Sequence, residues 1–318
     1  MKSKIAMLTA AAALAVSITG CSANTEAQMM NTSDEQVVET LEQIRDLEPV
    51  DYVYYKVEDA TLYLKTQEDA EYTKYVATPQ IGFMDMLSEP NKITKVVFEE
   101  PMALTNCACL FYNFQTLTEI ENINYLDTSH CTDFTRMFAQ CLLLPKVDVS
   151  HFDTSNAVST KYMFQSCLML SNIDVSNWDM SKVESISNMF AHCRELLVLD
   201  ISNWNVENVV HADNLFNQCD KLSVIDVSKW NTKNMKYIYN MFYDCDALTA
   251  LDISSFNMSN VLNMKNLIEN CPSLETLMVP ANNGAGLDNG TALLLGANTD
   301  VRYVINLEGV EIITPEKP

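Results

Sequence analysis

A 26-residue period runs through the middle of the chain and limits the folds open to it. Cysteines recur at this step with no insertion or deletion, and an aspartate, a serine and an aromatic residue keep the same step. A fixed period of about 20 to 50 residues over more than three copies is typical of a solenoid, in which each unit buries its apolar face only against its neighbours. The recurring cysteines are Cys141, Cys167, Cys193, Cys219, Cys245 and Cys271.

Each copy combines a strand pattern with a pattern of tight turns or short helix. Leu199 and Ile201 flank Asp200, so two aliphatic side chains share one face of a short, half-buried strand. Over Ser187–Leu196, apolar residues recur at steps of one and three, which favours a short helix or a 3-10 turn behind the strand. The sequence therefore predicts an α/β solenoid, with short parallel strands on one face and short helices or 3-10 turns on the other.

The flanking sequence predicts an anchor and two caps. Apolar residues at helical spacing predict a helix over 35–47, tyrosines alternating with polar residues predict strands over 52–75, and Lys92–Phe98 reads as a further strand. The tyrosines Tyr52, Tyr54, Tyr63 and Tyr72 suit either a ligand platform or, as we favour, the rim of a cap. The predicted segments are a signal peptide (1–20), a tether (21–34), an N-terminal helix and cap (35–91), the solenoid (92–280) and a C-terminal cap with closing strands (281–318).

The first 21 residues have the features of a secretion signal. Two lysines precede an apolar run over 5–16, which is too short for a bilayer that needs about 20 residues. The stretch Ser17–Gly20 directly before Cys21 resembles a bacterial lipobox. That resemblance implies cleavage before Cys21 and attachment of diacylglycerol to its sulfur, and a plain cleaved signal peptide is the alternative.

The chain is strongly acidic, with 20 basic and 42 acidic side chains and a net charge of −22. Removal of residues 1–20 takes away Lys2 and Lys4 and no acidic residue, which leaves 18 basic and 42 acidic side chains and a net charge of −24. A surface of this sign repels phosphate groups, so we expect no nucleic-acid partner. A basic partner or a cation fits better.

Two stretches of each copy keep a common form, as in Met163–Leu170, which reads Met-Phe-x-x-Cys-x-x-Leu, and Val147–Ser155, which reads Val-Asp-x-Ser-x-Phe-Asp-Thr-Ser. They resemble the repeat unit of BspA-like bacterial surface lipoproteins, whose copies read much like Met-Phe-x-x-Cys-x-x-Leu, then Leu-Asp-x-Ser-x-Phe-Asp-Thr-Ser. The lead-in Ile93–Glu99 is also similar, and the resemblance spans about residues 92–280. It implies a leucine-rich-repeat-like right-handed coil at the bacterial cell envelope or surface, with a role in adhesion or in host or envelope protein binding, and it brings no catalytic motif.

The cysteine ladder has three possible roles: a metal stack, a chain of disulfides, or a column of small buried side chains. Metal sites need paired cysteines or added histidines, and within the chain only Cys107 and Cys109 lie close in sequence. With Cys21 lipidated an odd number of thiols remains, and side chains at one repeat position all point the same way. We therefore expect buried free thiols that pack as small hydrophobes, and a bridge, if any, from Cys107 to Cys109 or Cys131.

The open face of the strands is the predicted binding surface. If Leu199 and Ile201 point into the core, Val198 and Asp200 project outward. The predicted surface holds an acidic column of Asp148, Asp174, Asp200, Asp226 and Asp252 beside a flanking column of Lys146, Asn172, Val198 and Val224. Stacked carboxylates repel each other, and a cation, a basic ligand or backbone donors could each stabilise them.

Together these features predict a lipid-anchored surface protein that binds a protein or another macromolecule through its strand face. A structural or spacer protein of the envelope without a specific ligand is the alternative. The two differ in that a binding face carries side chains that vary from copy to copy, as the flanking column does. We expect no enzyme, no cofactor and no metal, because the four histidines occupy different repeat positions with no serine or cysteine at motif spacing.

The anchor leads to the first testable prediction. Cys21→Ala should move the protein from the membrane fraction to the soluble fraction, because acyl chains on Cys21 would supply most of its membrane affinity. Fractionation of cells followed by immunoblotting measures this, with Cys109→Ala as the matched control. Unchanged membrane retention of Cys21→Ala would contradict the lipid anchor.

Overall fold

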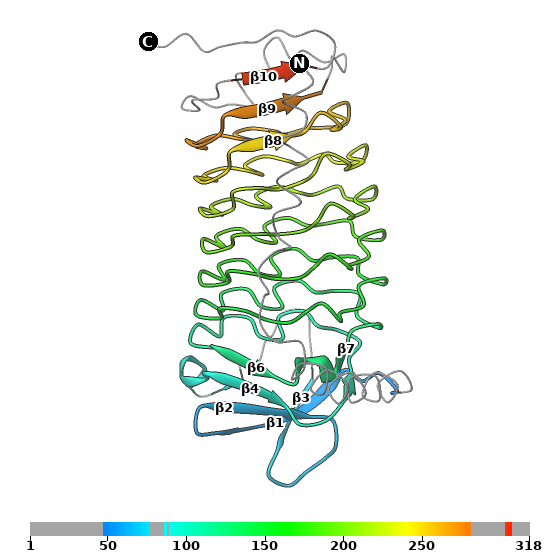
Figure 1. The fold of residues 1–318 in the computed structure, drawn as a ribbon. Helices are drawn as coiled ribbons and strands as arrows, with labels where there is room; N and C mark the ends of the chain where they lie inside the picture. Colours follow the sequence, from blue (N-terminus) through cyan, green and yellow to red (C-terminus); the bar gives the residue numbers. More distant parts are fainter. Residues whose placement is uncertain (1–46, 77–85, 88, 281–302, 307–318) are drawn as a thin grey trace, which may run out of the picture. The chain divides into compact units, whose positions relative to one another are not determined.

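The computed structural model describes residues 47–76, 86–87, 89–280 and 303–306 (Figure 1). These residues all belong to one of the two compact units of the chain, Ile44–Pro318. The predicted signal peptide, Cys21 and the tether lie outside the described residues. So do nearly all of the predicted helix over 35–47 and most of the predicted C-terminal cap.

Among the described residues the structure is strand-rich and has almost no helix (Figure 1). Its 3-10 helices are η2 (Pro90–Lys92) and η3 (Ile123–Tyr125). Its strands are β1 (Tyr52–Glu58), β2 (Thr61–Lys65), β3 (Thr73–Val76), β4 (Lys95–Phe98), β5 (Met102–Ala103), β6 (Glu119–Glu121), β7 (Leu126–Asp127), β8 (Ala250–Asp252), β9 (Thr276–Val279) and β10 (Tyr303–Asn306).

A five-stranded sheet in the order β3-β1-β2-β4-β6 precedes the regular copies. The tyrosine-rich segment forms the antiparallel β1–β2 hairpin and β3, as its alternation predicts. Asp59 and Ala60 turn the hairpin with φ of 47° and 64°, the positive values that a type I′ turn requires. From β2 onward the pairing is parallel, through β4 to β6, so this sheet leads into the repeats.

The regular copies pair through single bridges where the sequence predicts short strands. Parallel bridges join Lys146 to Asn172 and Asn172 to Val198, and regular strands at this register are β8 and β9. In each copy an aspartate stands two residues after the bridge and a serine two residues after the aspartate. The aspartate carboxylate accepts a hydrogen bond from the N–H of this serine, as Asp200 does from Ser202 at 3.1 Å. This local turn ends the extended segment, which explains why the strands are so short.

The segment behind the strands is a series of tight turns, so the alternative of 3-10-like turns describes it better than the alternative of a short helix. In one copy Asn188 and His192 have φ of 57° and 64°, and left-handed residues recur at the same two positions from Arg136 to Asn270. A left-handed residue every fourth position interrupts an α-helix. Bonds from Met189, Ala191 and Cys193 to the carbonyl three residues earlier close the turns.

The other N–H groups of this segment reach the next copy. Ile186, Asn188, Phe190 and His192 donate to carbonyl oxygens 25 residues later, at 2.7 to 3.0 Å. Alternate N–H groups therefore bond within the copy and between copies. Figure 1 shows the result as loops of one form lying side by side between β7 and β8.

Aromatic side chains form two continuous columns inside the copies. Phe138, Phe164, Phe190, Phe216 and Phe242 stack with ring centroids 5.3 to 6.1 Å apart. In the second column, Trp204 stacks on Trp230 and Trp230 on Phe256. Each indole Nε1 donates to a carbonyl of the preceding copy, as Trp204 does to Val175 at 3.0 Å. Full burial of such side chains contributes about 1.5 to 3 kcal/mol each.

The six ladder cysteines are buried free thiols, as the sequence predicts. The column is not purely apolar, however, because each Sγ donates to a phenylalanine carbonyl 29 or 30 residues earlier, as Cys193 does to Phe164 at 3.1 Å. Burial raises the pKa of the Cys167 thiol to about 12. It raises the pKa of Cys193 as well, so both stay protonated near neutral pH.

The two ends of the repeats differ from the middle. Cys107 and Cys131 form a disulfide with Cα atoms 6.1 Å apart, one of the two pairings that the sequence left open. At the other end β10 pairs in parallel with β9, within the segment predicted to close the sheet.

The buried thiols predict a fall in stability at alkaline pH. Their folded pKa is raised, so they stabilise the fold fully below the ordinary thiol pKa of about 8.5 and progressively less as the pH rises above it, since unfolded thiols ionise there. Urea unfolding at pH 7 and pH 9 measures this, and Cys167→Ala should weaken the dependence. Rapid reaction of these thiols with a thiol reagent in the native protein would contradict it.

Candidate binding groove

Each carboxylate of the predicted acidic column is held by its own turn. Asp200 Oδ1 accepts both the N–H and the hydroxyl of Ser202, the latter at 2.8 Å. The same pair of bonds occurs at Asp148, Asp174 and Asp226, and Asp252 accepts the N–H of its serine. Local donors therefore provide the stabilisation for which the sequence left three possibilities open.

The flanking column is exposed, as the alternation of the strand predicts. Lys146, Asn172, Val198 and Val224 all face solvent, while Leu199 is buried. Val198 is 66% exposed and Val224 is 57% exposed. The two valines form a small apolar area next to the acidic column.

A second column of parallel bridges runs along the copies at a different position of the repeat. Its side chains change at nearly every step, and those from Ser159 to Asn263 border a groove of about 650 Å³. The column consists of Asp133, Ser159, Ser185, His211, Tyr237 and Asn263. The residues that line the groove are Val158, Ser159, Lys161, Tyr162, Glu184, Ser185, Ser187, His211, Asp213, Tyr237, Tyr239 and Asn263.

Along this column, two neighbouring residues with rings lie next to two residues with small side chains. His211 and Tyr237 stack in parallel, with ring centroids 4.8 Å apart and an interplanar angle of 11°. The next residues of the column on the other side of His211 are Ser185 and Ser159, which have no ring. The column therefore steps down at Ser185, and the His211 side chain beside this step is 47% exposed.

A nearly buried carboxylate lies beside the ring stack. The side chain of Asp213 is 10% exposed, and its Oδ1 accepts a hydrogen bond from Ser187 Oγ at 2.8 Å. The pKa of Tyr239 is raised, most strongly by burial and next by the negative charge of the Asp213 carboxylate. The groove thus combines a held carboxylate, hydroxyl groups and aromatic rings.

The tyrosine cluster is tied into the polar contacts of the cap sheet. Lys74 Nζ lies 3.8 Å from the ring centroid of Tyr52, and Lys65 Nζ lies 4.0 Å from that of Tyr72. Tyr72 donates to Glu99 at 2.5 Å, and burial followed by this bond raises its pKa.

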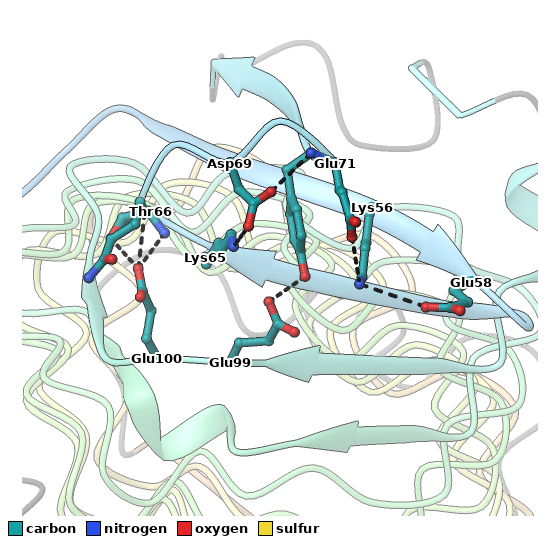
Figure 2. Close-up of polar contacts among 10 residues, drawn as sticks. Lys56, Glu58, Lys65, Thr66, Asp69, Glu71, Glu99 and Glu100 are labelled. Carbon is teal, nitrogen blue, oxygen red and sulfur yellow. Dashed lines mark hydrogen bonds and ion pairs between the residues drawn. The ribbon is translucent and has the colours of Figure 1, made fainter.

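Figure 2 shows the neighbouring bonds of this cluster, in which Lys65 pairs with Asp69 and Thr66 bonds to Glu100. Lys56 lies between Glu58 and Glu71, at 3.7 and 3.9 Å. Charged and hydroxyl groups of this sheet therefore bond to one another, which favours the interpretation of the tyrosines as the rim of a cap.

Neither a metal cluster nor a membrane-spanning helix occurs in the part of the chain that the structure describes. The described residues contain no group of three or more His, Cys, Asp or Glu side chains placed to share an ion. No helix among them is long and apolar enough to cross a bilayer.

The sequence interpretation missed the groove because it placed the binding surface on the strand face, at the invariant aspartates and the varied column that flanks them. The groove uses positions that change from copy to copy, such as Ser185, His211 and Tyr237. These residues keep the 26-residue step, so aligning the copies and looking for varied polar positions would have found the column. An alignment of the copies could not predict the groove itself, which Lys161 and Asp213 help to line, because its shape depends on three-dimensional packing.

Comparison with known proteins gives a family match. A family model described as "Mycoplasma protein of unknown function, DUF285" matches residues 105–223 and 170–279, which together span more than half of the chain. No curated protein matches the chain. Among solved structures, a leucine-rich repeat protein from Bacteroides ovatus is 14% identical, with 74% of this chain and 88% of that chain covered and a TM-score of 0.18, which is too low to support an argument about the fold.

The local bonds of the acidic column predict a measurable titration. The hydroxyl of Ser150 lowers the pKa of Asp148, so Ser150→Ala should raise the titration midpoint of this carboxyl toward its ordinary value. Carboxyl carbon chemical shifts followed by NMR measure the midpoint. Ser202→Ala, which removes the same contact two copies away, should leave Asp148 unchanged, and an unchanged midpoint in Ser150→Ala would contradict the assignment.

Proposed function

This chain belongs to the DUF285 family, and on that premise we propose that its stacked copies form a leucine-rich-repeat-like, right-handed solenoid that binds another macromolecule. The observation that carries the proposal is the groove along the column from Ser159 to Asn263. A hollow of this size, bordered by polar side chains and rings, offers both directional bonds and contact area to a ligand.

The variety of side chains favours the groove over the acidic column as the binding surface. Every copy from Asp148 to Asp252 repeats the same aspartate, and each aspartate already has local donors. In the groove, by contrast, serine, histidine, tyrosine and asparagine succeed one another on one backbone position. A surface that recognises a specific partner needs such differences, whereas a spacer does not.

A binding role agrees better with the groove than an enzymatic one does. Ser185, His211 and Asp213 lie near one another, which raises the possibility of nucleophilic catalysis. However, His211 Nδ1 is 4.0 Å from Asp213 Oδ1, beyond hydrogen-bond length, and Ser187 holds the carboxylate instead. His211 packs its ring on Tyr237. These contacts suit a recognition surface, so we propose that the protein is not an enzyme.

We further propose that the protein works outside the cytoplasm, at the bacterial cell envelope or surface, and is lipid-anchored to the membrane through Cys21. The Cys107–Cys131 disulfide supports this, because disulfides persist in oxidising compartments. The secretion signal before Cys21 and the resemblance to BspA-like lipoproteins point the same way. Adhesion, or binding of host or envelope proteins, is the activity that this resemblance suggests.

The proposed binding surface can be tested with two matched double variants. His211→Ala with Tyr237→Ala removes the ring stack of the groove, and we expect capture of macromolecules from envelope and host-cell extracts to fall about tenfold or more. Asp200→Lys with Asp226→Lys reverses charge on the acidic column and should leave capture nearly unchanged. Circular dichroism and the melting temperature confirm that both variants fold.

Each other outcome of this experiment has a definite meaning. If only the lysine variant loses capture, the ligand binds the strand face that the sequence predicts. If both variants bind like the wild type, the groove is not the binding surface. If the wild type captures nothing above a blank column, the spacer alternative replaces the binding role.

A further inference from the structure

The chemistry of the groove narrows the kind of ligand it can hold. Val158 is the one aliphatic residue among the described residues that line the groove. The others are serine, tyrosine, histidine, asparagine and charged residues. A peptide that binds in a groove usually anchors itself through apolar side chains in apolar pockets. This lining gives such side chains little to contact, so a polar ligand fits it better.

The charges in the groove argue against a strongly charged ligand. Lys161 is exposed and positive, Glu184 is exposed and negative, and Asp213 adds a nearly buried carboxylate. An anionic ligand would meet two carboxylates in a chain of net charge −22. A cationic ligand would be attracted by the two carboxylates, of which Asp213 is already bonded to Ser187, and repelled by Lys161. Paired donors and acceptors of both signs instead suit neutral hydroxyl groups, which donate and accept at the same atom.

The step in the column leaves one flat face of the His211 ring open to a ligand. Tyr237 stacks on one face of the His211 imidazole, and Ser185 lies next to His211 on the other side. This second face therefore borders the step and is not covered by another ring of the column. A sugar ring has one face made largely of C–H groups, which packs on an aromatic face while its hydroxyls bond at the edge. The Ser185 hydroxyl makes one long contact, at 3.4 Å, and the Asp213 carboxylate uses one of its several acceptor sites for Ser187, so both can still bond to a sugar hydroxyl.

We propose that this groove binds a neutral oligosaccharide chain, with one sugar ring on the His211 face above Ser185 and its hydroxyls bonded to Ser185 and to Asp213. This inference rests on the proposed binding function and names the ligand class of the same groove. The groove spans copies from Ser159 to Asn263, so it accommodates several sugar units in a row.

A substitution that fills the step tests the proposal directly. Ser185→Tyr places a third ring beside His211, at a half-exposed position whose hydroxyl makes one long contact, to Ser187 at 3.4 Å. Ser223→Tyr makes the same change at an exposed serine outside the groove and serves as the control. His211→Ala removes the ring face without adding volume, so it reads the same contact if Ser185→Tyr folds poorly.

The probe is a printed array of neutral and acidic oligosaccharides, incubated with the full chain. We expect signals confined to neutral oligosaccharides, about tenfold weaker for Ser185→Tyr and His211→Ala, and unchanged for Ser223→Tyr. Binding of acidic oligosaccharides in preference to neutral ones, or equal binding by all variants, would overturn the proposal.

A second arm separates the ligand class from the binding function itself. Periodate cleaves the vicinal diols of sugars and leaves most of a polypeptide backbone intact, so oxidised extracts should no longer be captured. If the array is silent and the oxidised extract is still captured in a way that depends on His211, the ligand is not a glycan although the groove binds. If no extract is captured at all, the proposed binding function fails and this inference fails with it.

Discussion

Hydrogen bonds between successive copies are the interaction on which the rest of this structure depends. Alternate N–H groups of each turn segment, such as those of Phe190 and His192, reach carbonyl oxygens of the next copy. The buried thiol of Cys193 and the indole of Trp204 donate to carbonyls of the preceding copy. Buried donors cost free energy when unpaired, so a single copy is incomplete, and about half of the N–H groups of its turn segment find a partner only in a neighbouring copy.

The same bonds explain why the turn segment is not a helix. In an α-helix each N–H bonds to the carbonyl four residues earlier, which would leave none for the next copy. Left-handed residues at Asn188 and His192 turn alternate N–H groups outward instead. The apolar steps of one and three are equally compatible with a short helix, and residues as different as Arg136 and Tyr162 take the left-handed position. The choice is made by contacts between copies, which no single copy displays in its sequence.

Positions that are apolar in every copy proved to be the packing positions. Burial of Leu199, Ile201, Trp204 and Cys193 follows directly from the alternation and the 26-residue step. The hairpin before the repeats was equally predictable from its alternating tyrosines. The hydrogen bond from each cysteine thiol to a phenylalanine carbonyl could not be predicted, because it depends on how closely adjacent copies pack. The predicted acidic column is exposed, yet its bonds to serine follow from a separation of two residues that is visible in every copy.

The exposed side chains of the groove follow a different logic, because the backbone already joins the copies there, although the buried pair Ser187 and Asp213 also bonds one copy to the next. Along the column from Ser159 to Asn263 the pairing is made by backbone atoms, so any side chain that points outward is compatible with it. A serine can then stand next to a histidine at the same backbone position, and the difference in size alone makes a step. The positions that are apolar in every copy therefore fix where the column lies, and the varied side chains determine the shape and the charges of the groove. Unfolding of the chain by Ser185→Ala or His211→Ala would contradict this separation, since neither residue contributes a buried side chain to the core.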